Sequence, residues 1–203
     1  MPRSARYRSV AGIYDLVSLE WPVYRPPRLA AIGALGLEPG QHVLDVGCGT
    51  GLNLAPLHDA LGPAGVVTAV DASAQMLAAA RRRAHRRGWH RDGFVRADVT
   101  GMAGSDLPPA DAAIATYALS LMSDWERALD AVVAAVRPGG RVAVVDLALA
   151  TGRLARPASR LACHLGGSDP SVWPWTRLEE RATDVVGWSM RAGHVQVRVG
   201  TVG

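Results

Sequence analysis

Three aspartates stand at or near the ends of three short apolar runs in this chain. They are Asp45, Asp71 and Asp98. A carboxylate at the end of a strand accepts hydrogen bonds from the hydroxyl or amino groups of a ligand. Aspartate also forms turns at such positions, so one of these residues alone would indicate little. Three in succession favour a ligand site built along one edge of a sheet.

Alternating glycines follow the first of these aspartates. In the stretch VLDVGCGTG they are Gly47, Gly49 and Gly51. Glycine adopts positive φ values and lets the backbone approach a ligand closely. The dinucleotide fingerprint is G-x-G-x-x-G, whereas here Leu52 occupies the place of its third glycine. The spacing disfavours a pyrophosphate ligand, while Asp71 lies at the sequence distance at which an acidic residue binds ribose hydroxyls.

Strands that alternate with helices must carry these residues to one edge. We expect an α/β fold, Rossmann-like and doubly wound, whose mostly parallel sheet places the ligand at the carboxyl ends of its strands. A C-terminal antiparallel hairpin, 185–191 with 194–199, should close one edge. The expected strands are 42–46, 66–70, 94–97, 111–116 and 141–147, and the expected helices are 27–37, 52–61, one from Ser73 to Gly88 and one capped by Ser123.

The composition is that of a globular chain. Of 203 residues, 49% are hydrophobic and 20% charged, with a net charge of +4. No uninterrupted apolar stretch is long enough to cross a membrane. The basic N-terminal residues are followed by no apolar signal segment, and two cysteines make no disulfide framework, so we expect a cytoplasmic location. The basic run RRRAHRR lacks interleaved aromatic residues, so we expect no nucleic-acid partner.

The motifs together resemble a known superfamily. VLDVGCGTG, VVTAVDASAQML, FVRADVT, ADAAIATYALSLM and RPGGRVAVVDL are similar, in order and spacing, to the class I S-adenosylmethionine-dependent methyltransferases. The fragments IYDLV and GGSDPSVWPW are most similar to bacterial phosphatidylethanolamine N-methyltransferase-like proteins, and the ubiquinone/menaquinone methyltransferases share the core motifs. We expect one methyltransferase domain over 1–203, with a helical lid at 1–40, a cofactor-binding core at 41–147, and an acceptor-side insert with the closing hairpin at 148–203.

The resemblance implies S-adenosyl-L-methionine as the cofactor. Residues 47–51 would hold its methionine portion with Asp45 behind them, Asp71 would bind the ribose, and Asp98 would accept from the adenine amino group. The expected cofactor contacts are Asp45, Gly47, Cys48, Gly49, Thr50, Gly51, Asn53, Asp71, Ala72, Met76, Asp98, Val99, Thr116 and Tyr117.

The reaction implied is an in-line displacement at the activated methyl group, for which the protein mainly aligns the reactants. No metal is required, and a general base is needed only if the acceptor must lose a proton. The expected catalytic residues are Tyr14, Tyr117 and His164. Tyr7, Tyr24, Trp173 and Trp175 are further candidates for the acceptor pocket.

The acceptor is less closely defined by the sequence. We expect N-methylation of an amine on a phospholipid or small metabolite, because aromatic faces suit an ammonium group. O- or C-methylation of a natural product or quinol is the alternative, and an inactive cofactor-binding module is an alternative of another class. The arginine- and leucine-rich segment 153–165 is compatible with peripheral membrane contact. The oligomeric state stays open.

Overall fold

Seven strands form one sheet in the computed structural model, which describes residues 23–203. The strand order is β3-β2-β1-β4-β5-β7-β6. Strands β1 to β5 are parallel, and β7 runs antiparallel between β5 and β6. The expected doubly wound sheet with a closing antiparallel hairpin is therefore confirmed. The strands are β1 (His42–Val46), β2 (Val66–Asp71), β3 (Gly93–Arg96), β4 (Ala110–Thr116), β5 (Val136–Leu147), β6 (Thr183–Met190) and β7 (Val195–Thr201).

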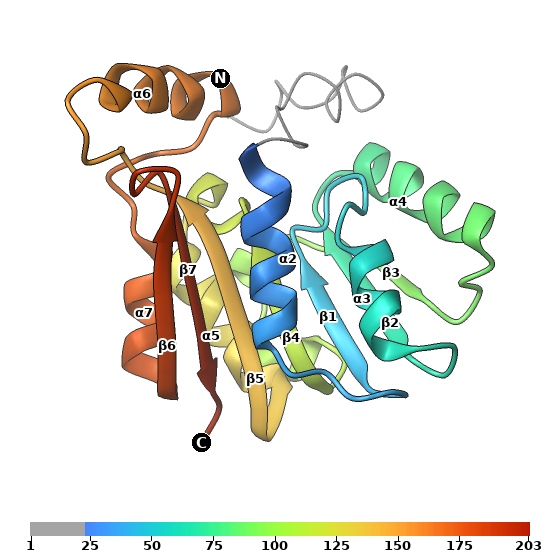
Figure 1. Cartoon of the computed structure of the whole chain (residues 1–203). Coiled ribbons are helices and arrows are strands. Elements are labelled where there is room, and N and C mark those ends of the chain that lie inside the picture. The colour runs from blue at the N-terminus through green and yellow to red at the C-terminus, as the bar shows by residue number, and fades with distance from the viewer. Residues whose placement is uncertain (1–22) are drawn as a thin grey trace.

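Helices cover both faces of this sheet (Figure 1). Successive side chains of a strand point to opposite faces, so Val43 packs with the helices of one layer and Leu44 with those of the other. The first layer consists of α2 (Arg25–Ala34), α3 (Leu54–Leu61) and α4 (Ala74–Arg87). The second consists of α5 (Trp125–Ala135) and α7 (Pro174–Arg181), with short 3-10 turns η3 (Val99–Gly101), η4 (Gly104–Asp106) and η5 (Leu119–Leu121).

Local capping explains where the central helices begin and end. The Ser73 hydroxyl accepts from the backbone N–H of Met76, and Gly88 ends α4 in the left-handed conformation, as expected from the sequence. The expected cap of α5 was wrong by one residue. Asp124, not Ser123, accepts from the backbone N–H of Arg127.

Two further boundaries differ from those expected. Strand β5 begins at Val136 rather than at 141, because Val136 pairs with Ala110 across a register shift in β4. In the C-terminal insert, where no helix was predicted from the sequence, α6 (Ala155–Gly166) contains Pro157. Pro157 is the third residue of α6, and the first-turn N–H groups of a helix have no intrahelical partner, so a proline is tolerated there.

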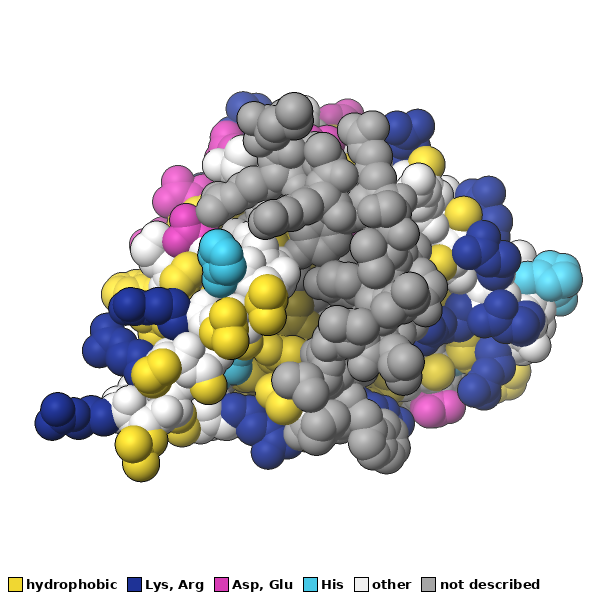
Figure 2. Space-filling view, turned by 90° about the horizontal axis from the view of Figure 1, so that it is seen from above, with side chains coloured by type: hydrophobic (Ala, Val, Ile, Leu, Met, Phe, Trp, Pro, Cys, Tyr) yellow, Lys and Arg dark blue, Asp and Glu magenta, His cyan; other side chains and the backbone are white. Residues whose placement is uncertain are grey.

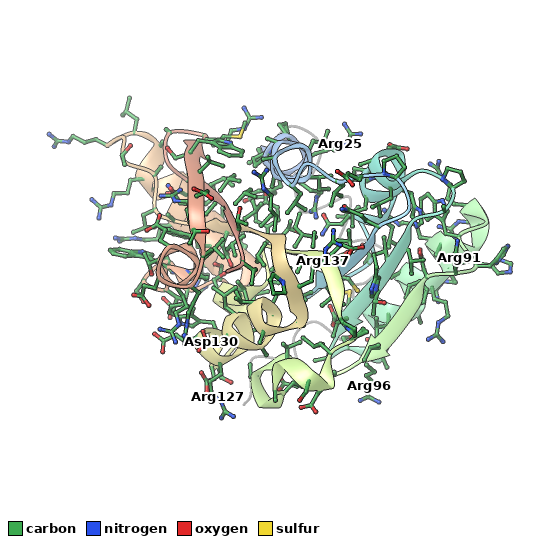
Figure 3. The ribbon with its side chains drawn as sticks, turned by 90° about the horizontal axis from the view of Figure 1, so that it is seen from below. Arg25, Arg91, Arg96, Arg127, Asp130 and Arg137 are labelled. Atoms are coloured by element: carbon green, nitrogen blue, oxygen red, sulfur yellow. The ribbon has the colours of Figure 1, made fainter. Side chains whose placement is uncertain are left out.

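The carboxyl ends of the parallel strands lie at the upper end of the molecule in Figure 1, where α6 also lies. Below α6, helix α7 is held against α5 by Asp130, which is labelled in Figure 3. Asp130 binds Arg177 at 2.7 Å and Arg181 at 2.8 Å. Hydrogen bonds from Arg177, then from Arg181, hold the pKa of Asp130 below its usual value against the opposing effect of desolvation. Among residues 23–203, every helix is too short or too polar to cross a membrane.

Candidate functional site

The loop after β1 is fixed by backbone hydrogen bonds from the end of β2. The N–H groups of Gly47 and Cys48 both donate to the carbonyl of Val70, at 2.8 and 3.1 Å. The N–H of Gly49 donates to Asp71 Oδ2 at 2.9 Å. The glycine loop and Asp71 therefore form one unit at the carboxyl ends of two neighbouring strands, where the sequence placed the ligand.

Two glycines of this loop have different surroundings. All three loop glycines have positive φ values. A Cβ added to Gly47 would stand 2.3 Å from the Cβ of Ala118, so this glycine is needed for packing. A Cβ added to Gly49 would meet no atom of the described residues within 4 Å. Gly49 therefore presents bare backbone to open space, as a ligand seat requires.

Asp71 carries a carboxylate that is held on both oxygens. Oδ1 accepts from the backbone N–H of Ser73 at 2.8 Å, and Oδ2 accepts from that of Gly49. Burial raises the pKa of Asp71, while these two backbone hydrogen bonds lower it. Each carboxylate oxygen has two acceptor positions, so Asp71 keeps acceptor capacity for a pair of ligand hydroxyls.

A buried polar network lies behind the glycine loop. Asp45 of β1 is fully buried, and its Oδ1 accepts from Asn53 Nδ2 at 2.6 Å. The guanidinium of Arg28 donates from Nη1 to Asn53 Oδ1 at 2.5 Å and to Thr116 Oγ1 at 2.7 Å. This network joins α2, β1, the loop before α3 and the end of β4.

The second oxygen of Asp45 lacks a hydrogen-bond partner within the described part of the chain. Burial raises the pKa of this carboxyl to about 6, against the lowering effects of the Asn53 hydrogen bond and of Arg28. Asp71 adds to the increase by charge repulsion. A buried acceptor without a donor is costly, so Asp45 Oδ2 marks a place for a ligand donor group.

Arg28 is a site residue that the sequence reasoning missed. It lies on α2 with only 6% of its surface exposed. Its guanidinium carbon lies 5.5 Å from the ring centroid of Tyr117. The available signal was an arginine within a stretch that otherwise reads as an apolar helix, between Pro27 and Ala31. Since arginine is rarely buried without partners, such a position indicates a buried network.

Tyr117 follows β4 in a backbone conformation that is unusual for a non-glycine residue. Its φ is 57°, which costs about 1 kcal/mol or more and must be held by surrounding contacts. Its N–H donates to the carbonyl of Val145 at 2.7 Å, and its hydroxyl donates to the backbone carbonyl of Tyr24 at 2.8 Å. These bonds turn the tyrosine back towards α2, next to Arg28.

A tyrosine–histidine pair adjoins Tyr117. The ring of Tyr24 lies edge-on to that of Tyr117, with centroids 5.1 Å apart. The hydroxyl of Tyr24 lies 3.4 Å from Nε2 of the buried His194, whose Nδ1 lies 2.7 Å from the carbonyl oxygen of Ala148. A carbonyl only accepts, so Nδ1 carries a proton, and Nε2 is the ring nitrogen that can accept from the Tyr24 hydroxyl. The pair can receive a proton from a group beside Tyr24.

His194 was also missed from the sequence. It lies in the turn between β6 and β7, 170 residues from Tyr24. The sequence pattern that predicted the hairpin gave no sign that its turn returns to α2. The expected catalytic His164 instead lies exposed on α6. The expected Tyr14, and Tyr7, lie outside the described residues.

The residues expected to face the adenine lie along β2, α4 and η3. Val99 and Met76 are buried at 3% and 6% exposure, while Ala72 is exposed. Asp98 is exposed, and its Oδ1 accepts from both the N–H and the hydroxyl of Thr100. Asp98 thus caps its own turn and keeps its second oxygen towards solvent. Ala72 directly follows β2, and Asp98 and Val99 follow β3, so these three lie at the carboxyl ends of two neighbouring strands.

The remaining expected residues differ in burial. Cys48 and Thr50 are buried within the loop. Burial, followed by the charges of Asp45 and Asp71, raises the pKa of the Cys48 thiol. Trp175 is buried in the second layer, whereas Trp173 is 54% exposed.

The donors and acceptors of this site fit S-adenosylmethionine. Its methionine part carries an ammonium and a carboxylate, which correspond to the unpartnered Asp45 oxygen and the Arg28 guanidinium. The ribose hydroxyls correspond to the acceptor capacity of Asp71. The open space next to the Gly49 backbone can hold the atoms that link the methionine part of the cofactor to its ribose.

Comparison with known proteins agrees with this fit. Residues 43–140 match the family model described as a methyltransferase domain. A ubiquinone/menaquinone biosynthesis C-methyltransferase of Pasteurella multocida is 29% identical over 143 residues, which are 69% of this chain and 53% of the relative. Nocamycin O-methyltransferase of Saccharothrix syringae is 30% identical over 135 residues, 66% of this chain and 46% of the relative. The chain spans about half the length of these curated relatives.

Solved structures share the fold. A SAM-dependent methyltransferase from Aquifex aeolicus superposes with a TM-score of 0.68 at 17% identity, covering 98% of both chains. A SAM-dependent O-methyltransferase from Thermotoga maritima gives a TM-score of 0.65 at 18% identity, covering 96% of this chain and 71% of the other. At these identities the likeness concerns the fold alone.

Because only one oxygen of the buried Asp45 carboxylate accepts a hydrogen bond from the described residues, we expect the stability of the protein to depend on pH. Above about pH 6 the buried carboxylate is ionised in the folded and unfolded states, and the folded state bears the full cost of desolvation. Below about pH 4 both states are protonated and this cost disappears. The rise in pKa from 3.8 to about 6 corresponds to about 3 kcal/mol. The ligand-free protein should therefore lose up to this much stability from Asp45 as the pH rises from 4 to 6.

The matching variant is Asp45→Asn, which has nearly the same shape but no charge. Its free energy of unfolding, measured by urea titration, should exceed that of the wild type at pH 7 and change less between pH 4 and 6. Parallel pH profiles of the two proteins would contradict the assignment.

Proposed function

We propose, for a chain whose residues 43–140 belong to the methyltransferase domain family, that the protein transfers a methyl group from S-adenosylmethionine to a small-molecule acceptor. The observation that carries this proposal is the buried, unpartnered oxygen of Asp45 beside the bare backbone of Gly49. Burying that oxygen without a hydrogen bond destabilises the ligand-free protein. A donor group of the bound ligand would supply the missing hydrogen bond.

Each end of the cofactor has a suited partner in this proposal. Asp45 accepts from the methionine ammonium, and Arg28 binds the methionine carboxylate as a charge-assisted pair. Asp71 accepts from the ribose hydroxyls, and Asp98 and Val99 contact the adenine. The network through Asn53 holds Asp45 and Arg28 in fixed relation, so the ammonium and the carboxylate are bound in one orientation.

The cofactor supplies a methyl group on a sulfonium that is already a good leaving group. The protein's share is to align the acceptor in line with it and to exclude water. Thr116 and Tyr117 end β4 on the methionine side of the site, and Tyr24 packs against Tyr117. We therefore place the acceptor beside these tyrosines, with Tyr14 of the expected lid as a further contact.

We favour an acceptor that loses a proton, such as a hydroxyl or an acidic carbon. The Tyr24–His194 pair offers a proton-accepting chain at this place. The relatives named as a C-methyltransferase and an O-methyltransferase act on such groups by their names. A quinol or a natural product of similar size fits this class.

An amine on a phospholipid or small metabolite is the second candidate. The aromatic faces of Tyr24 and Tyr117 favour it, because they attract the methylated ammonium that forms when a neutral amine attacks the methyl group and the bond to sulfur breaks. A phospholipid acceptor also implies peripheral contact of the protein with a membrane. We place either reaction in the cytoplasm, in keeping with the free thiols of Cys48 and Cys163 and the reducing conditions there.

The ligand seat at Gly49 can be tested against a matched glycine. Gly49→Ala and Gly88→Ala each place a methyl group at a positive φ, 54° and 77°, where it meets no described atom. Both variants should lose about 1–2 kcal/mol of stability from backbone strain. By calorimetry, only Gly49→Ala should weaken the binding of S-adenosylhomocysteine, by about tenfold or more, because its methyl group occupies ligand space. Equal affinities in the two variants would exclude this seat, and no binding by the wild type would exclude the cofactor.

The ribose role of Asp71 predicts a larger effect than the adenine role of Asp98. Asp71→Ala removes two charge-assisted hydrogen bonds and should lower the affinity for S-adenosylhomocysteine by about 2–3 kcal/mol, or roughly 30- to 150-fold. Asp98→Ala removes one exposed contact and should cost roughly fivefold. An unchanged affinity of Asp71→Ala, in a variant with native circular dichroism, would refute the ribose role.

The acceptor class is decided by mass spectrometry of products from quinols, phenolic natural products, ethanolamine lipids and small amines. With a hydroxyl or carbon acceptor, Tyr24→Phe should reduce kcat by about 100-fold, in the range of general-base catalysis, and leave cofactor affinity unchanged. Methylation of amines with a rate unaffected by Tyr24→Phe would favour the second candidate. Cofactor binding without transfer to any acceptor would instead indicate a binding module without catalysis.

A further inference from the structure

Three leucines of α6 and its N-terminal cap lie in solvent. Leu154, Leu161 and Leu165 are 98%, 58% and 78% exposed. They are separated by seven and four residues, so they share one side of the helix. Only two other large hydrophobic side chains of the described residues are as exposed, and one of them, Trp173, follows α6 in the chain.

The opposite side of α6 attaches the helix to the protein with small polar groups. Ser159 and Cys163, four residues apart, are its buried residues. The hydroxyl of Ser159 accepts from the backbone N–H of Ala150 at 3.0 Å and donates to the carbonyl of Arg156 at 2.9 Å. Ser159 is two residues from Leu161, about 200° around the helix axis. The apolar stripe of α6 therefore points away from the body of the protein and contributes nothing to its core.

Positive charge accompanies this stripe. Arg153, Arg156 and Arg160 lie on the same segment, and no acidic residue occurs from 147 to 168. Within residues 23–203, these three arginines form no ion pair. Elsewhere the arginines of the second layer are neutralised, as those bound to Asp130 show. Arg153 and Arg160 are each one residue from a leucine of the stripe, about 100° around the helix axis, whereas Arg156 is two residues from Leu154 and lies on the other side. An apolar stripe with unpaired arginines along its flank is complementary to a surface with apolar depth and negative charge.

We propose that α6 docks on the surface of an anionic membrane, lying in the plane of the interface. The leucine stripe would enter the boundary between headgroups and acyl chains, and the arginines would meet the anionic headgroups. Trp173 would extend the contact, since tryptophan favours the membrane–water interface. A helix of 12 residues is too short to span a bilayer but long enough to lie on one.

The position of α6 gives this contact a direction. Helix α6 lies at the end of the molecule where β1 and β5 end (Figure 1). In the view from above, hydrophobic and arginine side chains lie next to one another on the left side (Figure 2). A further link runs from the loop after α6, where the hydroxyl of Ser168 lies 2.7 Å from that of Ser120 beside the end of β4. A docked membrane would adjoin the acceptor side, although docking itself does not depend on the proposed reaction.

The test is co-sedimentation of the full chain with vesicles, without cofactor or acceptor. The wild type should bind phosphatidylcholine vesicles that contain phosphatidylglycerol and should bind pure phosphatidylcholine much more weakly. The double variant Leu161→Asp with Leu165→Asp should lose at least about tenfold in partition. The control Val186→Asp alters a valine that is 53% exposed on β6 and not on α6, and should bind as the wild type does.

A second pair of variants tests the charge. Arg153→Glu with Arg160→Glu, at the flank of the stripe, should reduce binding to the anionic vesicles by at least about 20-fold, at roughly fivefold for each arginine lost. Arg91→Glu, which changes an exposed arginine before β3 at the opposite end of the sheet (Figure 3), should have little effect. Calorimetry with S-adenosylhomocysteine tests each variant's fold and the cofactor proposal separately from docking.

Two results would overturn the inference. The first is a wild type that binds S-adenosylhomocysteine but sediments with neither vesicle. The second is a leucine variant that binds vesicles as well as the wild type. If the wild type is a dimer in solution and the leucine variant a monomer, with no vesicle binding by either, the stripe is covered by a second copy of the chain and the membrane inference is wrong.

Discussion

The half-satisfied carboxylate of Asp45 is the constraint on which the site depends. It is fully buried, so its one hydrogen bond, from Asn53, must be held firmly. Arg28 does this by donating to Asn53 and to Thr116. Through these contacts α2, β1, the glycine loop and β4 are fixed relative to one another. The polar network therefore organises the same elements that the sheet brings together, and it leaves one oxygen free.

Such an arrangement sets stability against function. A buried carboxylate with an unused acceptor destabilises the empty protein, and the pKa of about 6 expresses that cost. Apolar residues of similar volume would remove it, as at the neighbouring Leu44 and Val46 of the same strand. The strained φ of Tyr117 lies at the end of the adjacent strand. Both costs fall at the carboxyl ends of β1 and β4, while the rest of the two strands is ordinary core.

The sequence predicted those features whose contacting residues are close together along the chain, and it missed those whose partners are far apart. The glycine turn after β1, the cap at Ser73 and the Gly88 terminus are local patterns, and the structure has each of them where the sequence placed it. The parallel order of the sheet followed from strands alternating with helices. Arg28 and His194 could not be found in this way, because their partners lie between 25 and 170 residues away. A buried arginine and a histidine in a turn acquire their meaning from tertiary contacts, which no periodicity records.

The orientation of helix α6 is a second feature that local sequence patterns do not determine. From the sequence, segment 153–165 is compatible with peripheral membrane contact, but the spacing of its leucines does not say which way they point. The structure turns them outward because Ser159 finds a backbone partner at Ala150 and Cys163 enters the core. Burying the leucines instead would leave that N–H without its acceptor. The outward orientation is thus the one that satisfies the polar groups of the insert, and it leaves an apolar surface at the end of the molecule where the parallel strands end.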